Sequence, residues 1–180
     1  MWLNSTDSYG YFSKFLHWIM AIIIIGLMAV GLYMTELDKD DSSRRGLYQL
    51  HKEFGLTIIF LGIIRIIWIT ISHPPSLPTG LKVWETKLAK STKHLLYLLI
   101  LLVPASGYIM STLLGYPVDV FGLFEFPLLF DKNKETGEIF RTVHMIIAYC
   151  MIGVLALHIA GAVKHRLFDH ANNDVLKRML

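Results

Sequence analysis

Two histidines lie inside an uncharged stretch of the sequence that is long enough to cross a bilayer, and they could bind a metal ion there. The stretch runs from Val143 to Val163, and the histidines are His144 and His158. Their spacing is close to four helical turns, so both lie on nearly the same helix face, roughly 21 Å apart along the axis. A titratable side chain inside a membrane span is costly and usually functional. Because a neutral imidazole that binds iron avoids a buried charge, the spacing predicts two stacked sites on one helix.

The composition is that of a membrane protein. Hydrophobic residues make up 54% of the 180 residues, and the mean hydropathy is +0.50, well above that of a soluble domain. The net charge of +3 is small and lies in short loops, so nucleic-acid binding is not indicated. The single cysteine, Cys150, permits no disulfide framework, and no C-x-x-C-H motif is present for covalent haem attachment. We expect Cys150 to be a small buried apolar residue.

The apolar runs predict an all-α fold, a bundle of four transmembrane helices in a single domain covering residues 1–180. Pro104, followed by Ser106 and Gly107, predicts a kink in the third helix. Leucines, a tryptophan and lysines alternate over residues 81–93, as in a short helix on the membrane surface. The aromatic half of the loop at 115–138 is expected to fold onto the bundle. The predicted membrane helices span residues of about 12–34, 47–72, 93–114 and 140–165.

The distribution of charge predicts the orientation of the bundle. Four spans place both termini on one side, together with the loop between the second and third helices. On that side the basic residues outnumber the acidic ones, whereas both loops of the opposite side carry more acids than bases. The positive-inside rule therefore puts both termini in the cytoplasm.

Two further histidines then fall at the depths of His144 and His158. His51 begins the second helix near the outer face, level with His144, and His17 lies near the inner face, level with His158. Each pair offers two imidazoles from different helices, which could clamp a haem iron from both faces inside the bundle. For any single histidine, an interfacial or hydrogen-bonded core role is the alternative.

The ordered set of motifs resembles the bacterial di-haem cytochrome b-561 family of four-helix membrane electron carriers. The resemblance covers nearly the whole chain and implies two non-covalent haem b groups, with iron held by His17, His51, His144 and His158. The motifs that carry it are Lys14-Phe15-Leu16-His17-Trp18, His51 with Gly55, Arg65, Lys93-x-x-x-Tyr97-Leu98 with His94, Pro104 and Gly107, Val120-Phe121-Gly122-Leu123 with Pro127, and His144 with His158.

Arg65 and His94 are further candidates for cofactor binding. Arg65 follows His51 by the spacing that separates the two histidines of the fourth helix, so it should face the interior near the inner haem and pair with a propionate. The alternative is an arginine that snorkels to the cytoplasmic surface. His94 could form a hydrogen bond with a propionate, help bind a quinone head group, or replace His17 as ligand. The alternative is an interfacial histidine with no role in cofactor binding. His73, His165 and His170 are expected to contact water.

Small residues follow the proposed ligands by about one helical turn and could leave room for a flat macrocycle, although close helix packing favours the same residues. They are Gly55, Ala148, Gly161 and Ala162.

The predicted function is transmembrane electron transfer through two bis-histidine haems, in exchange with the membrane quinone pool. Whether the chain is itself an enzyme, a quinone oxidoreductase, stays open. One alternative is the cytochrome b membrane subunit of a larger hydrogenase- or dehydrogenase-type complex. Another is a haem-free transporter or structural bundle whose histidines carry protons or metal. The expected partners are the lipid bilayer, quinone, and an unidentified electron donor or partner subunit. A homodimer is a further candidate assembly.

Overall fold

Four long helices and one small hairpin make up the fold in a computed structural model, which describes residues 1–169 and 174–180. All four helices are long and apolar enough to cross a membrane, as the apolar runs predicted. In chain order the elements are α1 (Tyr11–Glu36), α2 (Arg44–Ile71), α3 (Val83–Leu113), β1 (Val118–Val120), β2 (Phe124–Phe126) and α4 (Lys134–Leu167).

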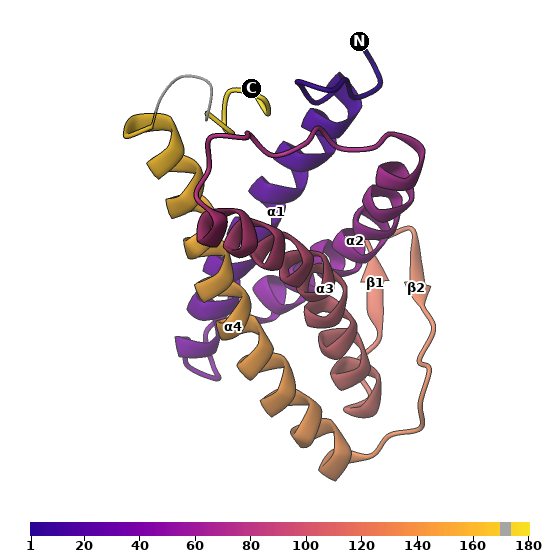
Figure 1. The fold of residues 1–180 in the computed structure, drawn as a ribbon. Coiled ribbons are helices and arrows are strands. Elements are labelled where there is room, and N and C mark those ends of the chain that lie inside the picture. The colour runs from indigo at the N-terminus through magenta and orange to yellow at the C-terminus, as the bar shows by residue number, and fades with distance from the viewer. Residues whose placement is uncertain (170–173) are drawn as a thin grey trace.

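The helices pack in chain order, α1 against α2, α2 against α3 and α3 against α4. Both termini lie at one end of the bundle, next to the connection between α2 and α3 (Figure 1). There the indole of Trp18 donates to the carbonyl of Met179 at 3.0 Å, and Asn4 bonds the backbone of Ser72 at 2.8 Å. We call this the terminus end of the bundle.

The hairpin β1–β2 marks the opposite end, which we call the hairpin end. Before it, α3 ends at Leu113, and Gly115 just beyond the helix has a φ of +79°, a left-handed conformation that suits glycine. The N–H of Tyr116 then bonds the carbonyl of Ser111 at 2.9 Å, which closes the helix with a Schellman motif. Turning back, the hairpin packs Phe121 on Phe54 and Phe126 on Phe60. These contacts confirm that the aromatic half of the loop folds onto the bundle.

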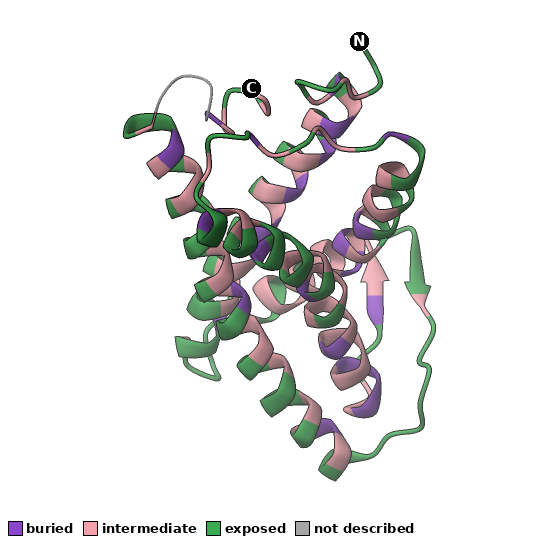
Figure 2. Ribbon diagram, in the orientation of Figure 1, coloured by how far each residue is buried: buried purple, intermediate pink, exposed green. Residues whose placement is uncertain are grey.

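The buried core is small and lies midway along the bundle. Only a few residues of each helix are buried, and long exposed faces run along all four (Figure 2). Side chains such as Ile22, Ile67 and Ile146 are apolar and exposed on these faces, as lipid contact requires. The core residues are Met20, Ile24, Ile58, Leu99 and Met151.

Two predicted helix boundaries differ from the structure. Residues 81–93 do not form a separate surface helix, because α3 begins at Val83 and runs on without a break. No glycine or proline interrupts this segment, and the Glu85 carboxylate accepts from the N–H of Lys82 at 2.9 Å, which caps the start. Helix α4 begins at Lys134, ahead of the predicted 140, because Asn133 accepts from the N–H of Thr136 at 3.0 Å.

Candidate functional site

Two pairs of histidines face each other at different levels of the bundle. At the hairpin end, the ring centres of His51 on α2 and His144 on α4 are 6.3 Å apart. At the terminus end, the ring centres of His17 on α1 and His158 on α4 are also 6.3 Å apart. We call these the hairpin-end pair and the terminus-end pair. The buried core of the bundle, with Met151 halfway between His144 and His158, separates them.

The ring separation suits a metal ion held between the two imidazoles of a pair. An imidazole nitrogen binds a first-row metal at about 2 Å, and the ring centre lies roughly 1 Å behind it, so two opposed ligands place their ring centres about 6 Å apart. Within residues 1–169 and 174–180, no group of three or more His, Cys, Asp or Glu side chains could hold a metal ion. Each pair therefore suits a metal that brings most of its own ligands, as a haem iron does.

Open space next to the pairs supports the same interpretation. A Cβ atom added to Gly55, one turn beyond His51, would meet no atom within 4 Å. The same holds for Gly161, one turn beyond His158. A flat group bound at either pair would thus find room along the helix that carries its ligand.

The protonation of His144 is set by its surroundings. Its Nδ1 lies 2.9 Å from the carbonyl oxygen of Val103 on α3. Since a carbonyl only accepts, Nδ1 carries the proton and donates, and Nε2 keeps a free lone pair. This arrangement of a metal-binding histidine, with the far nitrogen fixed by an acceptor, is the usual one. A Cβ on Gly107 would lie 3.0 Å from Cε1 of His144, so the missing side chain lets the ring approach α3.

The ring of His51 also packs against a glycine, which here belongs to α1. A Cβ on Gly31 of α1 would lie 3.1 Å from Cε1 of His51, so here too a glycine admits the ring. The Nδ1 atom of His51 is buried and has no hydrogen-bond partner among the described residues. This nitrogen lies on the α1 side of the ring, 3.6 Å from where the Gly31 Cβ would be.

A positive charge lies beside the terminus-end pair. The Arg65 guanidinium is 3.3 Å from Nδ1 of His17, which agrees with its predicted interior position and not with snorkelling. Arg65 also lines a narrow pocket with Asn4, Tyr9 and Tyr97. A guanidinium flanked by phenol and amide groups is suited to an anionic group such as a carboxylate.

Neither His94 nor His73 belongs to one of the two ring pairs. His94 and His73 are exposed, and neither forms a hydrogen bond within the described part of the chain. The structure thus places His17, not His94, opposite His158. His170 lies outside the described residues.

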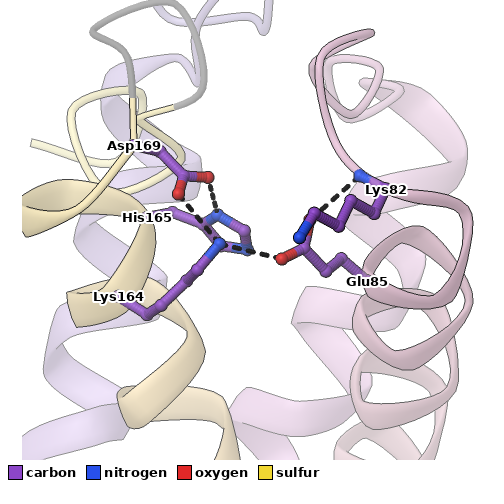
Figure 3. A network of polar contacts seen from close by, with 5 residues as sticks. All are labelled: Lys82, Glu85, Lys164, His165 and Asp169. Atoms are coloured by element: carbon purple, nitrogen blue, oxygen red, sulfur yellow. Dashed lines mark hydrogen bonds and ion pairs between the residues drawn. The ribbon is translucent and has the colours of Figure 1, made fainter.

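For His165, the expectation of a water-exposed side chain is wrong. It is buried, and its Nδ1 lies 2.7 Å from Asp169 Oδ2. The last turn of α4 is held against the start of α3 by a cluster of polar side chains (Figure 3). Lys164 bridges the carboxylates of Glu85 and Asp169 at 2.8 Å each, and this turns His165 inward. We call Lys82, Glu85, Lys164, His165 and Asp169 the clasp.

The expectation that Cys150 is buried is also wrong, since its side chain is exposed. Cys150 lies mid-span on a face of α4 that no other helix covers. In a bilayer that face meets lipid, where a small apolar thiol is equally stable.

Sequence reasoning missed the groups that hold the candidate ligands. Gly31, the carbonyl of Val103 and the hydroxyl of Ser106 all contact a histidine ring. The sequence signal was Pro104 with Ser106 and Gly107 inside a span, which we interpreted only as a kink. Backbone carbonyls leave no mark in a sequence, so Val103 could not have been singled out.

Comparison with known proteins decides the family. The model of the family described as prokaryotic cytochrome b561 matches residues 8–180. Cytochrome b561 homolog 2 of Escherichia coli (strain K12) is 35% identical over 179 residues, which cover 98% of this chain and 93% of that protein. The chain belongs to the prokaryotic cytochrome b561 family. It is therefore a multi-pass membrane cytochrome that binds haem b and takes part in electron transfer.

Proposed function

We propose that this cytochrome b561 carries electrons across the bacterial inner membrane through two haem b groups. His51 and His144 would hold one, and His17 and His158 the other. The observation that carries the proposal is the equal ring separation of 6.3 Å in both pairs. Two independent pairs with the spacing of opposed axial ligands are hard to explain as ordinary helix packing.

The donor set determines the kind of chemistry. Two imidazoles per iron leave no open position for oxygen or a substrate, so the bound group supplies electron exchange and not bond formation. The protein's part is to fix the imidazoles, exclude water and tune the potential. The apolar core around Met20, Ile24 and Met151 supplies the dry surroundings between the two levels. Their separation along α4 is roughly 21 Å.

Arg65 would serve the terminus-end haem through a propionate. Its guanidinium can only donate, so the contact with Nδ1 of His17 leaves the proton of that ring on Nε2. Metal binding through Nε2 requires the other tautomer, and Arg65 must then give up this contact. Tyr9 and Tyr97, which line the pocket with Arg65, would join it in binding the carboxylate.

The charge of the loops supports an orientation with the terminus end in the cytoplasm. The hairpin-end pair would then lie near the outer face and the terminus-end pair near the inner face. We propose membrane quinone as one exchange partner, since electrons carried between the faces need a redox partner soluble in the bilayer.

The test is the haem content of the purified chain together with its reaction with quinone. We expect two haems per chain in a pyridine haemochrome assay, and oxidation of the dithionite-reduced protein by a short-chain ubiquinone in detergent. One haem or none per chain would contradict the two-site proposal. Two haems that react with quinone only when another subunit is added would favour the alternative of a subunit of a larger complex.

A further inference from the structure

A hydroxyl on α3 contacts the hairpin-end ligand His144. The Ser106 side chain is 6% exposed, and its Oγ lies 3.0 Å from Nδ1 of His144. The same Oγ is 2.6 Å from the carbonyl oxygen of Val103, which is itself 2.9 Å from Nδ1 of His144. Three polar atoms, Ser106 Oγ, the Val103 carbonyl oxygen and His144 Nδ1, thus form a closed triangle.

The direction of each hydrogen bond in this triangle follows from the chemistry of its members. The Val103 carbonyl accepts only, so both the Ser106 hydroxyl and the His144 Nδ1–H donate to it. With its proton committed to Val103, the Ser106 oxygen presents a lone pair to Nδ1–H. The Nδ1–H of His144 is therefore shared between two oxygen acceptors. Gly107, whose Cβ would lie 3.0 Å from the ring, lets the ring reach both.

The terminus-end pair has a different environment. There Nδ1 of His17 faces the Arg65 guanidinium at 3.3 Å. Within the described ranges, no hydroxyl or carbonyl oxygen accepts a hydrogen bond from the ring of His17 or of His158. One pair is thus backed by electron-rich oxygens and the other by a positive charge.

We propose that Ser106 is a positioning residue for His144 and lowers the reduction potential of the haem at the hairpin-end pair. Acceptors at Nδ1–H raise the basicity of the imidazole, and a more basic ligand favours ferric over ferrous iron. The positive charge of Arg65 favours the ferrous state at the other pair. This inference rests on the proposed function, because it requires a haem at each pair.

The test is a spectroscopic redox titration of the purified holoprotein and of three variants. Ser106→Ala removes the hydroxyl, and Ser106→Thr keeps one at the same place. Ser111→Ala is the matched control, because Ser111 is also buried on α3 but donates to Tyr116, at 2.7 Å, and touches no histidine. Changes to such supporting partners alter metal affinity or activity by about 10–100-fold.

We expect Ser106→Ala to raise the midpoint potential of the hairpin-end haem alone. A tenfold change in the equilibrium between the two iron states is about 59 mV for one electron. Ser106→Thr should restore the wild-type value, and Ser111→Ala should leave it unchanged. Selective loss of one haem in Ser106→Ala, with retention in Ser106→Thr, would also support a positioning role.

Several outcomes would overturn the inference. The hydroxyl has no special role if Ser106→Ala shifts neither haem, shifts both equally, or behaves like Ser111→Ala. A downward shift would show that Ser106 competes with His144 for the Val103 carbonyl instead of supporting the ring. The proposed function is tested separately, by the haem content of the wild-type protein. If it is wrong, the wild type itself will bind fewer than two haems per chain.

Discussion

At the scale of single residues, the charge of Arg65 beside His17 leads to a directional prediction. Replacing it in Arg65→Leu removes a positive charge from the terminus-end site, so the potential of that haem should fall, on the order of 60 mV for a tenfold change in its equilibrium constant. The hairpin-end haem, four turns away along α4, should change much less. A redox titration that resolves the two centres measures both shifts.

Arg65→Lys provides the control for that experiment. It keeps the charge but loses the planar fork that binds a carboxylate in two places. If charge alone matters, Lys should retain most of the wild-type potential. Equal shifts of both haems in Arg65→Leu would argue against a local role for Arg65.

The histidine pairs predict a pattern of haem loss. His51→Ala and His144→Ala should each remove or loosen the same haem, because loss of either imidazole leaves the iron with one protein ligand. Combining them should add little, since groups that act as one unit are not additive, whereas a double variant across the pairs should lose both haems. Low-temperature absorption spectra, which resolve two b-type centres, provide the measurement.

His94 supplies the counter-test at the terminus end. His94→Ala should leave both centres intact, because His94 is exposed and lies opposite neither ligand. If His94→Ala removes a haem while His17→Ala does not, the assignment of His17 is wrong.

At the scale of helices, the clasp joins the end of α4 to the start of α3. The hydrogen bond from Lys164, followed by that from His165, holds the pKa of Asp169 below its ordinary value of 3.8. A carboxylate with a lowered folded-state pKa contributes stability that is fully present above the unfolded pKa and lost as the pH falls through the folded one. The clasp should therefore weaken below about pH 4.

Asp169→Asn tests this contribution. Its thermal unfolding midpoint should lie below that of the wild type at neutral pH and converge with it under acid conditions, as measured in detergent at a series of pH values. Asp131→Asn, at an exposed position on the loop before α4, is the matched control and should follow the wild-type profile. Parallel curves for Asp169→Asn and the wild type at every pH would contradict the assignment.

The helices also show what sequence could and could not predict. The existence, order and approximate depth of the four helices follow from apolar runs that are long enough to span a bilayer. The start of α3 at Val83 does not, because the lysine-rich segment is an equally good surface helix on its own. Its contact with Lys164, from the far end of the chain, favours the continuous helix. Tertiary contacts of this kind have no signature within one segment.

The sequence also predicts some parts of the candidate site and not others. Depth and facing were enough to pair His51 with His144 and His17 with His158, because a helix fixes the position of each side chain along its axis. The sequence could not show which groups support the ligands. Every residue has a backbone carbonyl, so nothing in the sequence marks the carbonyl of Val103 as the one that contacts His144. The inward position of His165 was missed because it depends on Asp169 and Glu85, which come from two different segments.

At the scale of the whole molecule, the small core predicts that the haems hold the bundle together. Among the described residues, the fully buried cluster is Met20, Ile24, Ile58, Leu99 and Met151, with partly buried side chains packed against it, so we expect bound groups to add substantially to the interior contact. A ligand that binds only the folded state raises its stability in proportion to RT ln(1 + [L]/Kd), about 4 kcal/mol when its concentration is a thousandfold above Kd.

We therefore expect the haem-free protein to unfold at a markedly lower temperature than the holoprotein in the same detergent. Protein produced under haem limitation and then reconstituted with added haem would supply both states from one preparation. Adding haem should raise the midpoint in two steps if the sites fill separately. An unchanged midpoint would show that the helices are held by their own packing.

The sharing of α4 between the two pairs has a consequence for biogenesis. His144 and His158 both belong to α4, whereas their partners lie on α1 and α2, which are synthesised earlier. Neither pair exists until α4 has entered the membrane beside α1 and α2. The final residues then close on the first ones, where Trp18 bonds the carbonyl of Met179. A chain that stalls before α4 is inserted therefore has no complete histidine pair to hold a cofactor.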